Sequence, residues 1–114
     1  MSLLESNLLS DDEKMILLDC REAIKGLDAD AEIIPYGSRA RGKAGTDSDY
    51  DLLIVSGTPA TLANEDRFRA AIYDIQLETA TVITVSMVNR DEWGTPPSRA
   101  MPLHQNIEKD GITL

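Results

Sequence analysis

Four consecutive apolar residues, Leu52 to Val55, end a strand predicted over residues 49–55, and this run constrains the fold more than any other feature. An unbroken apolar run is typical of a strand that is buried within a sheet. β-Branched residues dominate a second strand, predicted over residues 81–88, and recur in a shorter one over residues 31–36. Strands of this kind need helices to cover them, so the sequence predicts layers of helix and sheet.

The periodicity of apolar residues predicts the covering helices over residues 11–26, 60–78 and 99–109. Ser10 and Glu13 match a capping box at the start of the first helix. The resulting order of helix, strand, strand, helix, strand, helix predicts an α/β (α+β) fold, in which helices pack on a small mixed β-sheet.

Residues that break regular structure punctuate the C-terminal part of the chain. A loop is predicted between the last long strand and the last helix, at Gly94, Pro96 and Pro97. Pro102 is tolerated only near the first turn of the last helix, which Gly111 closes. Residues 112–114 are predicted to add an edge strand.

Length and charge bound the class of protein. At 114 residues the chain is predicted to be one domain over 1–114, with residues 1–9 interpreted as disordered or derived from cloning. The 11 basic and 20 acidic residues give a net charge of 11 − 20 = −9, which argues against long nucleic acid as a partner. Cys20 is the only cysteine and no uninterrupted apolar stretch reaches about 18 residues. We therefore expect a cytoplasmic protein with no disulfide and no membrane segment.

A phosphate-binding turn is predicted where the first strand ends. Gly37 lets the backbone bend sharply and approach a ligand, and Ser38 offers a hydroxyl and an amide where a short helix over residues 38–41 begins. Arg39 and Arg41, with Lys43, form the densest basic cluster of this acidic chain, and such cations pair with phosphate oxygens. The alternatives are a turn capped by Ser38 and a solvated loop whose cations pair with nearby carboxylates.

Asp49 and Asp51 begin the next predicted strand. Residues two apart on a strand point to the same side, about 6.6 Å apart along the chain, so these like charges repel each other. Mg²⁺ removes that repulsion, because it prefers oxygen ligands and needs only one or two carboxylates together with substrate phosphates. The alternative is a solvated strand end. Taken together, the turn, the cations and the two carboxylates predict a site for Mg²⁺ and a nucleoside triphosphate.

The segments GSRARG at residues 37–42 and SDYDL at residues 48–52 resemble the signature of the DNA polymerase beta superfamily, most closely its minimal nucleotidyltransferases. The resemblance implies that Gly37 and Ser38 hold the triphosphate of ATP or another nucleotide, and that Asp49 and Asp51 bind Mg²⁺ and are catalytic. It also implies attack by a hydroxyl on the α-phosphorus with release of pyrophosphate. Many such proteins pair with a helical HEPN-type toxin, so an antitoxin role, by modifying or by masking that partner, is a further implication.

One departure from the family pattern concerns catalysis. The family usually carries a third carboxylate on the following strand, which helps to accept the proton of the attacking hydroxyl. No carboxylate occurs between Thr79 and Asn89, and Thr84 or Ser86 stands about where it is expected. Glu78 and Asp91 flank that strand outside the ordinary position. Because a general base contributes typically 10²–10⁴-fold, its loss slows transfer without abolishing nucleotide binding.

Three functions therefore stay open at this stage: a nucleotidyltransferase, a catalytically weak antitoxin that masks its partner, and an ordinary α/β domain whose aspartates cap a strand. Other residues are given packing roles or left open. His104 is predicted to have a surface or packing role, and Trp93 to anchor the loop that follows it. Cys20 is predicted to be buried, and Tyr36 and Tyr50 either to touch a nucleotide or to pack.

Overall fold

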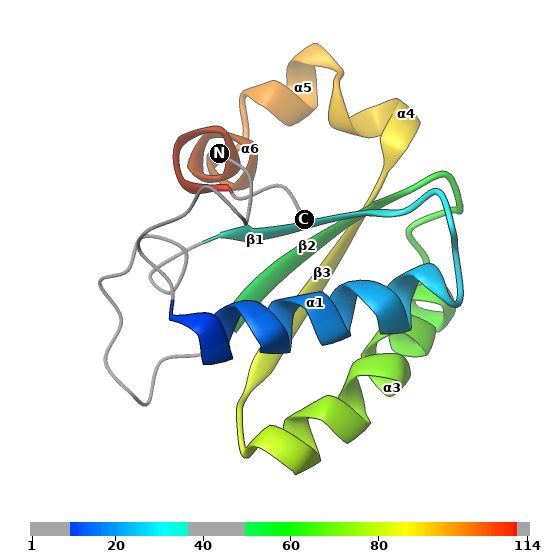
Figure 1. Cartoon of the computed structure of the whole chain (residues 1–114). Helices are drawn as coiled ribbons and strands as arrows, with labels where there is room; N and C mark the ends of the chain where they lie inside the picture. The colour runs from blue at the N-terminus through cyan, green and yellow to red at the C-terminus, as the bar shows by residue number, and fades with distance from the viewer. Residues whose placement is uncertain (1–9, 37–49, 112–114) are drawn as a thin grey trace.

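The computed structural model of the chain describes residues 10–36 and 50–111. Its sheet contains β1 (Glu32–Tyr36), β2 (Tyr50–Ser56) and β3 (Ile83–Asn89) in the order β1-β2-β3. β1 and β2 are antiparallel, whereas β2 and β3 are parallel. The predicted mixed sheet is therefore confirmed, as Figure 1 shows.

Two helices cover one face of this sheet. α1 (Asp11–Lys25) and α3 (Leu62–Thr79) lie side by side against the sheet, as Figure 1 shows. The predicted capping box starts α1: Glu13 N–H donates to Ser10 Oγ at 3.2 Å, and Ser10 N–H donates to Glu13 Oε1 at 3.0 Å. Both bonds satisfy amides that a helix start leaves without intrahelical partners.

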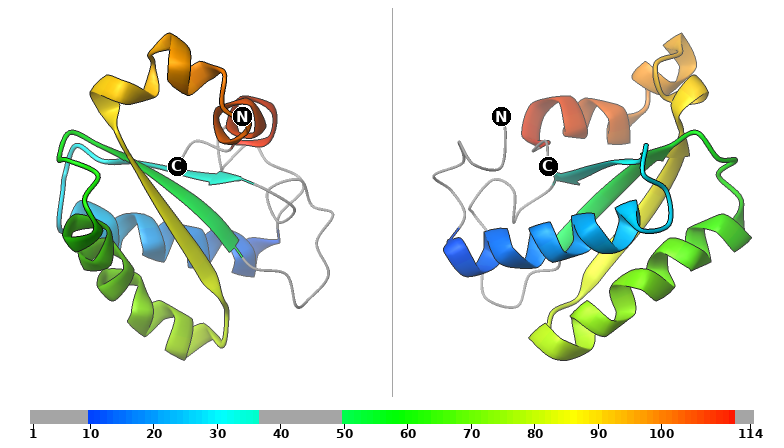
Figure 2. Two further views of the ribbon diagram at one scale, coloured as in Figure 1. Left: turned by 180° about the vertical axis from the view of Figure 1, so that it is seen from behind. Right: turned by 45° about the vertical axis from the view of Figure 1, so that its right-hand side comes forward.

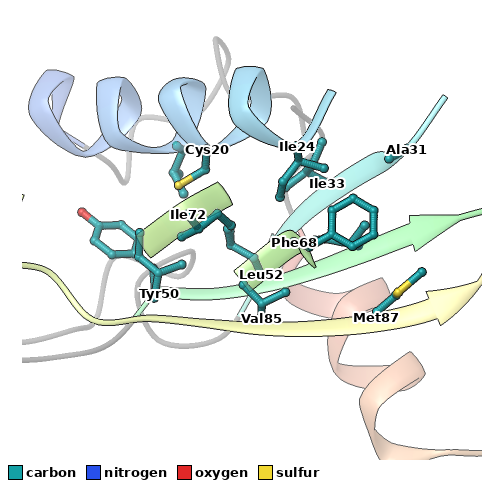
Figure 3. Packing of buried hydrophobic residues seen from close by; sticks show 13 residues of the cluster. Cys20, Ile24, Ala31, Ile33, Tyr50, Leu52, Phe68, Ile72, Val85 and Met87 are labelled. Atoms are coloured by element: carbon teal, nitrogen blue, oxygen red, sulfur yellow. The ribbon is translucent and has the colours of Figure 1, made fainter. Parts of the chain in front are cut away.

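The main core lies between these two helices and the sheet. Leu52 of β2 is fully buried there and points toward Ile72 of α3, with Val85 of β3 beside it (Figure 3). Tyr50 also faces this core and is only 2% exposed. Even-numbered residues of β2 therefore point toward α1 and α3, and odd-numbered residues point away from them.

A smaller layer of helices covers part of the other face. It contains α4 (Arg90–Trp93), α5 (Pro96–Arg99) and α6 (Pro102–Asp110), where the sequence predicted a loop and one helix. Leu53 and Val55 of β2 pack there against Ile107 of α6, with Trp93 of α4 at the border. The views in Figure 2 show this layer opposite α1 and α3. Within the described ranges, no helix is both long enough and apolar enough to cross a membrane.

The loop prediction over residues 94–97 is wrong at α5. Proline lacks an amide hydrogen, but the first amides of a helix need no intrahelical acceptor, so Pro96 starts α5 without a lost bond. Asn89 caps α4 by accepting a hydrogen bond from Asp91 N–H at 2.9 Å. α6 begins at Pro102 and not at residue 99, because residue 99 still belongs to α5. Pro102 is therefore in the first turn of α6, as predicted, and Gly111 follows its last residue.

Cys20 faces the main core from α1 and is fully buried, as predicted. Burial, and to a smaller extent the negative charge of Asp19, raises the pKa of its thiol from 9.0 to about 12. The reactive thiolate is correspondingly rare in the folded protein.

The native protein is therefore expected to resist thiol reagents. A pKa of about 12 in place of 9.0 lowers the thiolate fraction at pH 8 by roughly 10³-fold, before burial restricts access. Because the folded pKa exceeds the unfolded one, the contribution of Cys20 to stability is complete below pH 9 and is lost as the pH rises toward 12. Labelling with a disulfide reagent at pH 8, native and in denaturant, measures the difference. Comparable rates in both states would contradict this burial.

Candidate functional site

Most of the predicted nucleotide site lies outside the described residues. This applies to Gly37, Ser38, Arg39, Arg41 and Asp49. Asp51 is described, and it anchors the part of the site that can be built from the structure.

Asp51 is the second residue of β2 and is half-buried on the face turned away from α1 and α3. Its register partners are Tyr36 on β1 and Thr84 on β3. Because paired residues of neighbouring strands point to the same side, these three residues form one row across the sheet, which we call the polar row. The next row consists of Ile34, Leu53 and Ser86.

The polar row lies at the border of the surface that α4–α6 cover, and its Tyr36 packs against the cluster of Leu53, Val55 and Ile107. α6 and Trp93 pack over Leu53 and Val55, which follow Asp51 on the same face of β2. Thr84 is exposed, and Tyr36 and Asp51 are half-buried. The polar row also adjoins residues 37–49, because β1 ends and β2 begins there.

The hydroxyl of Tyr36 interacts with side chains of the two other strands, Asp51 on β2 and Ser86 on β3. Burial raises the pKa of its hydroxyl above the ordinary value of 10.0, and the negative charge of Asp51 raises it further. A side-chain hydrogen bond with Ser86 acts in the opposite direction, because it stabilises the phenolate. Residues from all three strands therefore meet around one phenol.

Two substitutions are expected to move the pKa of Tyr36 in opposite directions. Asp51→Asn removes a negative charge and should lower that pKa, whereas Ser86→Ala removes the hydrogen bond and should raise it. A titration of ¹³C-labelled tyrosine by NMR measures both shifts. Asp74→Asn, an exposed change on α3, serves as the control and should leave Tyr36 unchanged. An unaltered pKa in Asp51→Asn would show that the two side chains do not interact.

The structure tests whether a third carboxylate lies beside Asp51. Of the two positions that the sequence left open, Thr84 and Ser86, Thr84 lies directly across from Asp51 on β3. β3 ends at Asn89, which is five residues beyond Thr84, or about 16 Å along a strand. Asp91 lies beyond that end, in α4. Glu78 belongs to α3, on the opposite face of the sheet. Neither flanking carboxylate therefore takes the family position.

The two tyrosines near the site have different roles. Tyr50 is buried in the main core and contributes to packing. Tyr36 is paired with Asp51, the residue after Tyr50, and its side chain lies on the same face of the sheet as Asp51. The sequence left both possibilities open for each of them. Only the register, which decides the face to which each side chain points, separates them.

His104 and Trp93 pack against each other, a contact that the sequence did not predict. Their ring centroids are 4.3 Å apart, and His104 is buried on α6. His104 Nδ1 lies 3.3 Å from Glu108 Oε1, but the geometry is too poor for a hydrogen bond. Among the residues that the structure describes, no group of three histidine, cysteine or acidic side chains is arranged to hold a metal ion.

The chemistry of the polar row, together with Ser86 of the next row, fits a hard cation and a polar ligand. Asp51 offers carboxylate oxygens, and Thr84, Ser86 and Tyr36 offer hydroxyl oxygens from the flanking strands. Mg²⁺ takes such oxygen ligands and is commonly held by one or two carboxylates with substrate phosphates. Asp51 is the one carboxylate of such a pair that the structure describes, and Asp49, two residues earlier in sequence, is the candidate for the second.

Comparison with protein families identifies the class of protein to which this fold and site belong. Residues 16–108 match the model of the nucleotidyltransferase domain. The match covers well over half of the 114 residues and includes both the polar row and the segment between β1 and β2. The chain belongs to the nucleotidyltransferase domain family, which supports nucleotidyl transfer as its general function. No curated protein matches the chain.

Proposed function

We propose that this chain binds a nucleoside triphosphate with Mg²⁺ and transfers a nucleotidyl group to a hydroxyl acceptor, with release of pyrophosphate. The observation that carries the proposal is the position of Asp51. It lies in the polar row, on the sheet end next to residues 37–49, within a chain of the nucleotidyltransferase family.

Each of the predicted site residues would have a separate role in binding the nucleotide and the metal. Gly37 and Ser38 would bind the triphosphate, and Arg39 and Arg41 would pair with its phosphate oxygens. Asp51, with Asp49, would hold Mg²⁺. When bound, that ion would neutralise charge on the transferring phosphate.

Transfer forms a bond between the acceptor oxygen and the α-phosphorus and breaks the bond to the departing pyrophosphate. The proton of the acceptor hydroxyl must leave during this exchange. In this chain β3 presents Thr84 across from Asp51, so the described residues place no carboxylate base there. We therefore propose a slow transferase, because a positioned base contributes typically 10²–10⁴-fold.

Addition of a carboxylate at Thr84 should accelerate transfer. Thr84 is exposed, so Thr84→Asp should fold normally and raise turnover by about tenfold or more, since it places a proton acceptor across from Asp51. Thr84→Asn has the same size without basicity and is the matched control, which should not accelerate transfer. Pyrophosphate release from each nucleoside triphosphate, with Mg²⁺ and candidate hydroxyl acceptors, is the measurement. Equal rates in Thr84→Asp and Thr84→Asn would contradict the proposed role of a missing base.

The absence of an acid on β3 across from Asp51 also favours a second candidate function, an antitoxin that acts by masking a HEPN-type partner. Masking requires binding and not turnover. Co-expression with the product of the neighbouring gene, followed by size-exclusion chromatography, tests it. A complex that persists in Asp51→Asn favours masking, whereas a partner modified only by the unmutated chain favours transfer.

A further inference from the structure

β3 is an outer strand of the β1-β2-β3 sheet. Tyr50 N–H donates to Val82 C=O at 2.9 Å, which fixes the direction in which each backbone group of the parallel ladder points. Residues at 82, 84, 86 and 88 turn their N–H and C=O groups toward β2. Ile83, Val85 and Met87 therefore turn theirs outward, and the rear view in Figure 2 shows no further strand beside them.

Side chains of α3 cover the first half of this outer edge. The Gln76 side-chain oxygen accepts a hydrogen bond from Ile83 N–H at 3.0 Å, and the Arg69 guanidinium donates to Val85 C=O at 3.3 Å. Such contacts protect exposed edges from pairing with other chains. Within the ranges that the structure describes, Val85 N–H and both backbone groups of Met87 have no corresponding partner.

An open hollow of about 360 Å³ adjoins the second half of the edge, where the side chains of Val85 and Met87 are buried in the main core. Met87 and Val88 of β3 line it together with Trp93 of α4 and Met101. Met101 is 56% exposed although its side chain is apolar. Glu92 is at the same hollow and carries a negative charge.

We propose that the second half of the β3 edge, together with this hollow, docks an extended basic segment of a partner protein. The N–H of Val85 and both backbone groups of Met87 would pair with its backbone, and an apolar side chain would enter the hollow beside Trp93. Glu92 and the net charge of −9 favour lysine or arginine in that segment. The same charge disfavours a second copy of this chain as the occupant. The inference does not depend on nucleotidyl transfer.

Hydrogen exchange measured by NMR on the full chain tests this site. The probe is a ten-residue peptide in which lysine alternates with valine or leucine. Its binding should slow exchange of the Val85 and Met87 amides at least tenfold. Ile83, whose amide already has Gln76 as its acceptor, should change little. A peptide of the same sequence with alternate amides N-methylated cannot extend the sheet and should not protect them.

Two variants distinguish peptide binding at this site from non-specific binding. Met101→Lys places a charge in the hollow and should weaken peptide binding at least tenfold, whereas Met15→Lys, at a residue of similar exposure on α1, should not. Failure of the lysine peptide to bind at millimolar concentration would overturn the proposal. Equal binding of the N-methylated peptide, or of a version with glutamate for lysine, would also overturn it. A dimer of the chain that Met101→Lys dissociates would instead assign the edge to a second copy.

Discussion

Replacement of Asp51 by asparagine is expected to abolish metal-dependent nucleotide binding and to lower pyrophosphate release at least 100-fold. The side chain keeps its size but loses the negative charge that a hard cation requires, and electrostatic groups at such sites contribute about 10²–10³-fold or more to rate. Calorimetric titration of Mg²⁺ with nucleotide and an assay of pyrophosphate release measure the two effects.

The fold of this variant should be intact or slightly stabilised. Asp49 and Asp51 are like charges two residues apart in the sequence, and asparagine relieves their repulsion. Asp74→Asn removes the same charge from an exposed position on α3 and is the matched control, which should retain binding and turnover. Retained binding in Asp51→Asn, or a strong fall in Tm without metal, would contradict the proposed role of Asp51.

Truncation of a buried leucine side chain on the central strand, β2, should have the largest effect on stability. Leu52 is 0% exposed in the main core, and Leu→Ala changes at such positions cost about 2–5 kcal/mol. In a domain of this size that loss corresponds to a fall in Tm of roughly 10 °C or more. Chemical denaturation and thermal melting followed by circular dichroism measure the change.

Two further leucines make this prediction specific. Leu53 is equally buried but faces α6, so Leu53→Ala should cost a similar amount if both faces of the sheet are covered. Leu62, 71% exposed at the start of α3, is the matched surface control, and its change to alanine should cost less than about 0.5 kcal/mol. A small effect at Leu53 would show that the α4–α6 layer does not cover the sheet as described.

Local patterns in the sequence predicted the main elements well. The Ser10 and Glu13 capping box starts α1 as expected, and the apolar run Leu52 to Val55 is buried on both faces of β2. These features depend on residues close in sequence, whose spacing alone decides their geometry. The breaks at Gly94 and Pro96 were misinterpreted as a loop because a proline that starts a short helix resembles one that interrupts a strand.

Long-range register explains what the sequence left open at the site. Tyr36 and Ser86 are 50 positions apart, yet the pairing of both outer strands with β2 brings their side chains into contact. No local spacing contains this information, because a shift of one residue would turn every side chain to the other face. The position of Thr84 across from Asp51 was predicted only approximately, and the strand register makes it definite.

Mn²⁺, a paramagnetic substitute for Mg²⁺, can locate the metal–nucleotide site in NMR spectra of the full chain. With a nucleoside triphosphate present, signals from Tyr36, Asp51 and Thr84 should broaden selectively, and this broadening should be lost in Asp51→Asn. Broadening centred instead on the acidic first turn of α1, or broadening unaffected by nucleotide, would contradict the placement of the metal–nucleotide site at the polar row.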